Sequence, residues 1–598
     1  MASRLAITAA LLLVTLAAYR HVGACGFVNL DDDAYVEFAP MVNQGLRPAA
    51  LVWAATAVHT ANWHPLTSVS HMVDCELFGL RAAPMHWENV GWHLLNCALV
   101  FLIWHRLTQA MGRSACVAAL FALHPLHVES VAWISSRKDL LCTVFWLLGI
   151  WAYLRWTEHP SRRRYLLAAL CLTTALLFKP MAVTLPATLL LLDAWPLRRR
   201  PTLPWRDLII EKMPLFAIVA AHSAITWMVQ SGAGAANYAA RISFEARLGN
   251  AFVAYARYVG KMFWPESLSP LYAHPGFWPA SLVATAAISL GLAILIVYRQ
   301  RHARPWLAFG GAWFLGTLVP VIGIVQVGAQ SMADRYTYIP LLGLFTALAW
   351  GGAELITTYP RLRRPLTAAA LSGLAACALL TDRQVLAWEN SERLYQKSIA
   401  GGEDNASIRY LLATASQAAG RPESAVVAQL EKALAYEPDY VNAHTQLAII
   451  ALRHQRFDEA LDRLEQNLRW EPRNESLHVN LGSFWSIRGD VPRGLRHYQE
   501  ALRLNPRSPG THRELAQAYQ KLNQPSTALT HYQTAAQLDP WNVSDWVNVG
   551  LILGQQGRLA DARRAFTRAL WIDPSNNDAR RNLPIVDQIE RGQMPRSP

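Results

Sequence analysis

The chain has 598 residues, too many for one domain, and 53% of them are hydrophobic while 16% are charged. Its formal net charge is +13, but the arginines cluster in short segments between apolar runs rather than along one basic surface. That distribution is typical of membrane-protein loops and excludes a nucleic-acid footprint.

Apolar runs recur through residues 1–380, each long enough to cross a hydrocarbon core of about 30 Å. Tyr19, Arg20 and His21 end the first run where a signal peptide needs small neutral residues, so we interpret it as an uncleaved helix. Lys179-Pro180 could turn two adjacent spans into one broken helix. The runs predict about eleven spans, at 5–24, 87–104, 114–131, 138–154, 165–179, 180–195, 209–228, 281–298, 306–326, 338–357 and 365–380.

Charge placement predicts the orientation of these spans. The segments assigned to the cytoplasm contain seventeen Arg and one acidic residue, whereas the first outer loop, 25–86, contains two Arg and six acidic residues. A second outer segment covers 231–279, and both outer stretches carry rings that suit the headgroup level. With the N-terminus cytoplasmic, an odd number of spans places the C-terminal domain on the outer side.

The soluble part repeats with a strict period. Pro438, Pro472, Pro506, Pro540 and Pro574 are each 34 residues apart. Inside the units a small residue recurs, at Ala460, Gly494, Ala528 and Ala562, with Leu464, Tyr498, Tyr532 and Phe566 four residues later. The small residue lets two helices approach and the proline ends the second helix, which is typical of the tetratricopeptide repeat (TPR). We predict a linker and lead-in helix at 381–404, five repeats at 405–576, and a capping helix and tail at 577–598.

An acidic triplet, Asp31, Asp32 and Asp33, follows soon after the first span. Like charges packed this closely raise the pKa of at least one carboxyl toward the range of a catalytic base. On composition alone, however, such a triplet is more often a solvated loop or a helix cap. Other polar side chains lie at the outer ends of apolar runs, where charges are expensive and often functional: His124, His127, Glu129, Arg137, Lys138 and Asp139.

Five motifs carry a resemblance to a known family. They are Phe27-Val-Asn-Leu-Asp-Asp-Asp-Ala-Tyr35, Asn62-Trp-His-Pro-Leu-Thr67, His124 to Trp133 with Arg137-Lys-Asp139, Lys179-Pro180, and Asp334-Arg-Tyr-Thr-Tyr338. With the repeats that follow, the chain resembles bacterial relatives of the transmembrane and TPR-containing O-mannosyltransferases. That family belongs to the C superfamily of membrane glycosyltransferases (GT-C). The resemblance implies an all-α protein in which a GT-C-like membrane bundle, 1–380, precedes a TPR α-solenoid.

The resemblance also implies an inverting glycosyltransferase in the bacterial inner membrane. A polyprenyl-phosphate donor gives a sugar, with a mannose-like hexose favoured, to a hydroxyl at the outer face, such as a Ser or Thr of a protein. Asp31 and Asp32 match the family's acidic pair, one as the base and the other orienting it. Arg137 and Lys138, followed by Lys179, Arg335 and His64, are the candidates for binding the donor phosphate. Asp33, His124, His127, Glu129 and Asp139 would support them, without metal or cofactor.

Other interpretations remain open. Arg137 and Lys138 could anchor a helix to headgroups, His124 and His127 could be hydrogen-bonding structure or a metal site, and Lys179 could snorkel beside a kink. The principal alternative function is a membrane-anchored TPR scaffold for an envelope complex, and a transporter ranks last because the ionisable residues gather at one face. The repeats should bind a protein partner or an acceptor, whose identity the period leaves open.

Overall fold

A computed structural model describes residues 2–58, 62–200, 202–232, 242–325, 328 and 330–592. Within these ranges the chain is almost entirely helical, as predicted, and it divides into two compact units. The first unit comprises 1–46 and 54–415, and the second comprises 47–53 and 416–598. The first unit therefore runs beyond the apolar spans and includes the predicted lead-in helix.

The helices of the first unit follow the predicted apolar runs closely. Part of the predicted second outer segment, 233–241, lies outside the described residues. The helices are α1 Ala2–Ala18, α2 Pro40–Asn43, α4 Pro65–Phe78, α5 Ala82–Thr108, α6 Met111–Leu123, α7 Val128–Ala132, α8 Arg137–Glu158, α9 Arg162–Phe178, α10 Leu185–Ala194, α11 Trp205–Gly232, α13 Phe244–Phe263, α14 Ala280–Gln300, α15 Pro305–Leu318, α16 Leu341–Thr358, α17 Arg363–Val385, α18 Ser391–Ala400 and α19 Ala406–Ala418, with α3 Pro48–Thr56 shared between the units.

Short turns of helix join several of these elements and place polar residues between them. One short antiparallel pair, β1 Tyr272–Ala273 with β2 Gln330–Met332, brings the segment after α13 beside the Asp334 motif. The turns are η1 Arg20–Ala24, η2 Asp33–Glu37, η3 Pro125–His127, η4 Ile134–Ser136, η5 Pro180–Thr184, η6 Asp334–Thr337, η7 Pro360–Leu362 and η8 Leu386–Glu389.

Each of the eleven predicted spans coincides with a helix or a helix pair, but the number eleven is not confirmed. Among the described residues, seven helices are long and apolar enough to cross a membrane, or eight if α6 and α7, bent by 54°, form one span. The others are short, because α9 has 17 residues, α10 has 10 and α15 has 14. A straight span needs about 20 residues.

Buried aromatic rings and a close backbone contact hold the first unit together. Trp313 makes edge-to-face contacts with Trp104 and Trp146, at centroid distances of 5.4 and 5.2 Å. On α15 and α16, a Cβ added at Gly310 would lie 2.4 Å from the carbonyl oxygen of Gly343, and the reverse distance is the same. Only glycine at both positions permits this approach, which is typical of helix packing in membranes.

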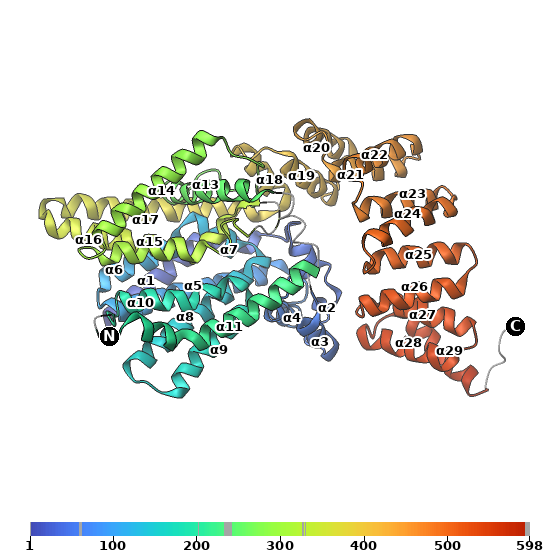
Figure 1. Ribbon diagram of the computed structural model, residues 1–598, viewed down its shortest axis with the longest axis horizontal. Helices are drawn as coiled ribbons and strands as arrows, with labels where there is room; N and C mark the ends of the chain where they lie inside the picture. The colour runs from blue at the N-terminus through green and yellow to red at the C-terminus, as the bar shows by residue number, and fades with distance from the viewer. Residues whose placement is uncertain are drawn as a thin grey trace. The chain divides into compact units, whose positions relative to one another are not determined.

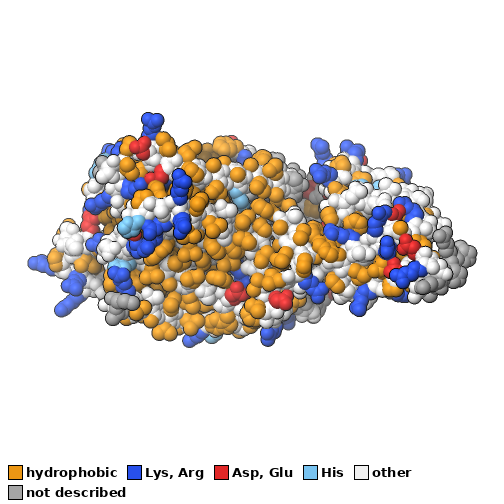
Figure 2. Space-filling model, turned by 90° about the horizontal axis from the view of Figure 1, so that it is seen from below, with side chains coloured by type: hydrophobic (Ala, Val, Ile, Leu, Met, Phe, Trp, Pro, Cys, Tyr) orange, Lys and Arg blue, Asp and Glu red, His pale blue; other side chains and the backbone are white. Residues whose placement is uncertain are grey.

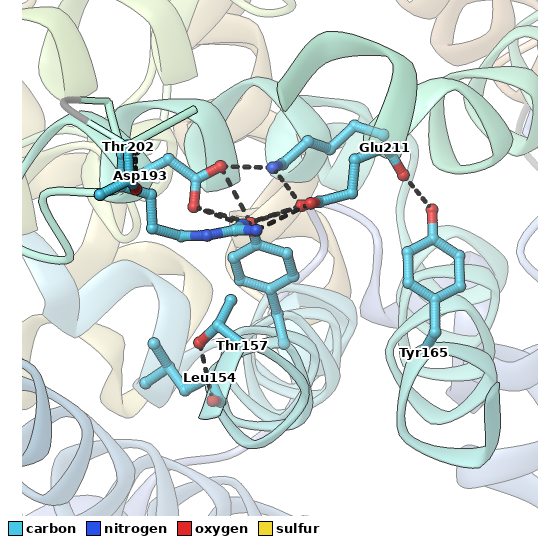
Figure 3. A network of polar contacts seen from close by, with 9 residues as sticks. Leu154, Thr157, Tyr165, Asp193, Thr202 and Glu211 are labelled. Carbon is cyan, nitrogen blue, oxygen red and sulfur yellow. Dashed lines mark hydrogen bonds and ion pairs between the residues drawn. The ribbon is translucent and has the colours of Figure 1, made fainter. Parts of the chain in front are cut away.

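A polar network ties α8, α10 and α11 together (Figure 3). Asp193 and Glu211 accept from Tyr153, Arg199 and Lys212, and the Arg199 Nη2 to Glu211 Oε2 distance is 2.8 Å. The two carboxylates and two cations balance one another in charge. This compensation explains how ionisable residues are accommodated at the start of an apolar helix.

Much of the exposed surface is hydrophobic. In one face-on view, hydrophobic side chains form a continuous field, with many Lys and Arg side chains toward its margins (Figure 2). The apolar windows of α14 and α17 are each only 6% buried. A surface this apolar fits a bilayer, so the chain is a membrane protein.

The second unit stacks helices in pairs with the predicted 34-residue period (Figure 1). The repeats also share a contact that the sequence analysis did not predict. Six residues after the repeat proline, a histidine ring nitrogen contacts the carbonyl oxygen of that proline. His444, His478 and His512 contact the carbonyl oxygens of Pro438, Pro472 and Pro506, at 2.8, 3.2 and 3.4 Å. The helices are α20 Glu423–Tyr436, α21 Val441–Arg453, α22 Phe457–Trp470, α23 Glu475–Ile487, α24 Val491–Leu504, α25 Pro509–Lys521, α26 Pro525–Leu538, α27 Val543–Gln555, α28 Leu559–Ile572 and α29 Asn577–Glu590.

Candidate active site

The middle carboxylate of the acidic triplet is completely buried. Asp32 Oδ1 accepts from the backbone N–H of Ser135 at 2.9 Å and from its hydroxyl at 2.6 Å. Oδ2 accepts from the backbone N–H of Val28 at 3.1 Å. These bonds fasten the first outer loop to η4, just before α8.

Burial raises the pKa of Asp32 to about 6, and the hydrogen bonds from Ser135 and Val28 oppose part of that rise. The neighbouring charge of Asp31 adds to the rise. A carboxyl with a pKa near 6 changes protonation within the range in which acid–base catalysts work. The charge state of this loop therefore depends on pH near neutrality.

The two flanking carboxylates have different surroundings. The Asp31 side chain is 38% exposed, and its Oδ2 lies 3.8 Å from Lys138 Nζ. Asp33 accepts from the backbone N–H of Ala34 at 2.8 Å, at the start of η2. Asp31 is thus both accessible and beside a cation, whereas Asp33 bonds to the backbone next to it.

Three of the predicted phosphate-binding cations lie along two aromatic rings. Lys138 Nζ is 5.6 Å from the Trp133 ring centroid, and the Arg335 guanidinium is 5.2 Å from the same ring. Arg335 is also 5.1 Å from the Tyr336 ring, and Lys179 Nζ is 5.6 Å from that ring. Residues from three separate segments of the sequence therefore form one row of alternating cations and rings, and we call it the cation row.

Buried carboxylates hold two of these cations. Glu129 forms an ion pair with the Arg335 guanidinium and also accepts from its backbone N–H at 2.8 Å. Asp139 lies 2.5 Å from Lys179 Nζ. Glu129 and Asp139, predicted as supporting residues, are thus in direct contact with the cations that they would position.

A cavity of about 390 Å³ opens at the Lys179 end of the cation row. Its lining includes His64, Lys179 and Tyr336, together with the polar side chains of Asn62 and Gln330. The structure therefore brings His64 and Lys179 together, although 115 positions separate them in the sequence. The volume is within the range of small-molecule sites, about 300–1,000 Å³.

Arg137, the first of the predicted phosphate-binding residues, lies in a buried network instead of in the cation row. Its guanidinium pairs with Asp74, lies 3.3 Å from Glu88, and donates to Asn89 at 2.8 Å and to the Met85 carbonyl at 3.0 Å. The sequence analysis did not identify Asp74 or Glu88. The available indication was an aspartate within the mostly apolar helix α4.

His124 and His127 both bond to backbone carbonyls. His124 Nε2 lies 2.9 Å from the Met262 carbonyl oxygen, and His127 Nδ1 lies 2.7 Å from that of Phe121. The His127 ring also meets Tyr338 edge-on at 5.0 Å. These contacts match the hydrogen-bonding interpretation of the pair.

Asp334 is a further buried acid that the sequence analysis left out of the site. Both of its oxygens accept from the Tyr272 hydroxyl, at 3.0 and 2.9 Å. Burial raises the pKa of Asp334 to about 8, while the charge of Lys261 opposes the rise. Asp334 therefore joins β1 to the segment that carries Arg335.

Comparisons with known proteins support the resemblance. The family described as dolichyl-phosphate-mannose-protein mannosyltransferase matches residues 73–227, and tetratricopeptide-repeat families match 418–481, 487–542 and 513–579. Protein O-mannosyl-transferase Tmtc1 of Drosophila melanogaster is 32% identical over 151 residues, 23% of this chain and 17% of that protein. Tmtc2 of the same organism is 36% identical over 132 residues, 21% of this chain and 14% of that protein.

A further relative gives a longer match. Human protein O-mannosyl-transferase TMTC4 is 22% identical over 413 residues, 58% of this chain and 54% of that protein. The chain is related to the TMTC O-mannosyltransferases. The mannosyltransferase family match includes Lys138 and Lys179, whereas the acidic triplet, His64 and Arg335 lie outside it.

The matches to TMTC proteins cover only part of each relative, from 14% to 54% of the three named above. Among solved structures, the TPR protein YrrB is 19% identical and covers 32% of this chain and 98% of its own, with a TM-score of 0.25.

Proposed function

We propose that the chain is an inverting glycosyltransferase of the bacterial inner membrane that uses a polyprenyl-phosphate sugar. The proposal rests on one arrangement, the accessible carboxylate of Asp31 beside Lys138, at the end of the cation row. The reaction needs a base to take the proton of the acceptor hydroxyl and cations to stabilise the leaving phosphate. The relationship to the TMTC O-mannosyltransferases favours a mannose-like hexose as the sugar and a Ser or Thr hydroxyl of a protein as the acceptor.

In this mechanism Asp31 is the base. The acceptor oxygen attacks the anomeric carbon while its proton passes to the Asp31 carboxylate. The bond from that carbon to the phosphate oxygen breaks, and its electron pair leaves with the polyprenyl phosphate, so the anomeric centre inverts. Asp32 is too buried to reach a substrate, and it acts as a positioning residue that fixes the loop on Ser135.

Lys138, Arg335 and Lys179 meet the charge that develops on the leaving phosphate. They are held before the donor arrives, by Asp31, Glu129 and Asp139 respectively, so little reorganisation is needed during the reaction. The cavity beside Lys179 and His64 would take the donor's polar end. Since these side chains supply positive charge, we assign no metal or cofactor to the site. We place Arg137 behind the cation row as a positioning residue, because its guanidinium is buried among Asp74, Glu88 and Asn89.

The repeats are proposed to present the acceptor or a protein partner. Tandem TPR helices build an extended surface suited to polypeptides. The scaffold alternative assigns them the whole function and needs no chemistry in the first unit.

The decisive measurement is transfer of radiolabelled sugar from a panel of polyprenyl-phosphate donors by the full-length chain in membranes. Wild type should label protein, and Asp31→Asn should lose at least about a hundredfold in rate, as expected when a general base is removed. Asp33→Asn is the matched control, because its remaining carbonyl oxygen can still accept from Ala34, and it should keep most of the rate. Equal transfer by the Asp31 and Asp33 variants would show that Asp31 is not the base. No transfer from any donor would favour the scaffold.

A further inference from the structure

A second, apolar cavity lies outside the candidate active site. It has a volume of about 540 Å³ and is bounded by α13, α14, α15 and α16. Its walls are formed mainly by aliphatic side chains such as Leu290, Ile294, Val297 and Leu315. A hollow of this composition fits a hydrocarbon chain rather than a sugar or a peptide.

The cavity faces the membrane. α14 is one of the candidate spans, and only 6% of its apolar window is buried, so most of that helix has no protein covering it. Along α14 and the residue after it, the lining runs from Ala286 to Arg301, a rise of about 22 Å. One leaflet of hydrocarbon is roughly 15 Å thick, so the groove is long enough for one lipid chain and the start of a headgroup.

One end of this groove is cationic. Arg301 lines it, donates to the Tyr298 carbonyl oxygen at 2.7 Å, and lies with its guanidinium carbon 3.8 Å from the Tyr298 ring centroid. An arginine stacked on a tyrosine at the end of a membrane helix lies at the depth of lipid phosphates. Arg301 is in the lining of the groove. The nearby Arg304 is outside the lining and forms an ion pair with Glu354 at 2.7 Å.

This cationic end is remote from the candidate active site. The first turn of α14 follows Trp278, which bonds to Asn250, and Asn250 in turn donates to Ser331 of β2, close to Asp334. Arg301 follows the last turn of the same 21-residue helix, about 30 Å away along its axis. A lipid held at Arg301 would therefore lie at the boundary opposite to the proposed sugar donor.

We propose that this groove binds one molecule of an anionic phospholipid, with an acyl chain along α14 and its phosphate at Arg301. Charge complementarity selects the headgroup, and the apolar walls hold the chain. The site is separate from the donor site and does not depend on the proposed transferase activity.

The test is native mass spectrometry of the purified full-length chain titrated with dioleoyl-phosphatidylglycerol or, in parallel, dioleoyl-phosphatidylcholine. One phosphatidylglycerol should be retained at least fivefold more tightly than phosphatidylcholine. Arg301→Gln should abolish that preference, whereas Arg299→Gln, two residues away and outside the lining, should preserve it.

A second pair of variants tests the groove itself. Ala293→Trp would fill the cavity, and Ala284→Trp puts the same bulk on an exposed part of α14 outside the lining. Only the first should lose the bound lipid. Equal binding of the two lipids, retention of phosphatidylglycerol by both Arg301→Gln and Ala293→Trp, or displacement of the lipid by a polyprenyl phosphate would overturn the proposal. If Ala293→Trp fails to fold, the comparison of Arg301→Gln with Arg299→Gln tests the proposal.

Discussion

Neighbouring residues in the acidic triplet have different chemical roles because their environments differ. Asp32 is fully buried under three hydrogen bonds, whereas Asp31 is partly exposed and faces Lys138. A substrate hydroxyl can approach only the second of these carboxylates. Asp32 fixes the position of the loop. Its protonation decides whether a charged carboxylate accepts the hydrogen bonds from Ser135.

The pH dependence of transfer should report Asp32. Its pKa is raised to about 6, so the charged form that accepts from Ser135 is lost as pH falls through that value. Transfer should therefore rise between pH 5 and pH 7. Ser135→Ala removes a hydrogen bond that lowers this pKa, so the rising limb should move to higher pH. An unshifted limb in the Ser135→Ala rate profile would show that another group controls it.

The buried pair of Arg137 and Asp74 should matter for stability. Removing one partner of a buried ion pair costs about 3–5 kcal/mol, and the lower end applies here because Glu88 still lies 3.3 Å from Arg137. Asp74→Asn should lower the thermal midpoint of the chain in detergent. The double variant Asp74→Asn with Arg137→Gln should recover part of the loss, since no buried guanidinium is then left without Asp74, although Glu88 also loses its partner. Additive losses would mean that the two side chains are not coupled.

At the scale of helices, small residues decide how closely elements approach. Gly310 and Gly343 bring α15 and α16 into backbone contact, and α15 is one of the helices that line the apolar groove. In the second unit, a Cβ at Gly482 would lie 2.5 Å from the Tyr498 ring, which shows the same principle within a repeat. Such contacts leave no room for even one methyl group.

Gly343→Leu should separate α15 from α16. The added side chain would collide with the Gly310 carbonyl and the Trp313 Cβ, at a cost of roughly 1–3 kcal/mol or more. The expected result is a lower thermal midpoint and reduced yield of the folded chain in membranes. At Gly352, on the same helix, an added Cβ would meet nothing within 4 Å, so Gly352→Leu serves as the control. Equal midpoints for the two variants would contradict the close contact.

At the scale of the whole chain, the lead-in segment and the first helix of the repeats also support the first outer loop. Asn29 donates from its backbone to Ser391 Oγ at 3.0 Å and from its side chain to Thr414 Oγ1 at 3.1 Å. The backbone N–H of Gly26 donates to the Glu389 carbonyl at 2.9 Å. The loop that carries Asp31 and Asp32 is therefore held by residues 362 to 385 positions later.

Two truncations should separate these roles. A chain that ends at residue 422 keeps α18 and α19, so it should retain binding of a polyprenyl-phosphate sugar. A chain that ends at residue 385 loses both helices and the bonds to Asn29, and its donor binding should fall at least tenfold. Binding of a labelled donor to each truncated chain in membranes measures the difference. Equal binding by the two would show that the loop needs no support from this segment.

The sequence by itself determined the features that depend on local pattern. The 34-residue proline period identified the repeats, and the apolar runs located a helix at each predicted span, because helix periodicity and burial are set within a few turns. Tertiary structure decided which helices are long enough to span. It also buried Asp32 on Ser135, 103 positions away, placed Arg137 with Asp74 and Glu88, and aligned Lys138, Arg335 and Lys179 on shared rings. Those outcomes depend on long-range packing, which fixes burial, charge pairing and side-chain direction and leaves no periodic trace along the chain.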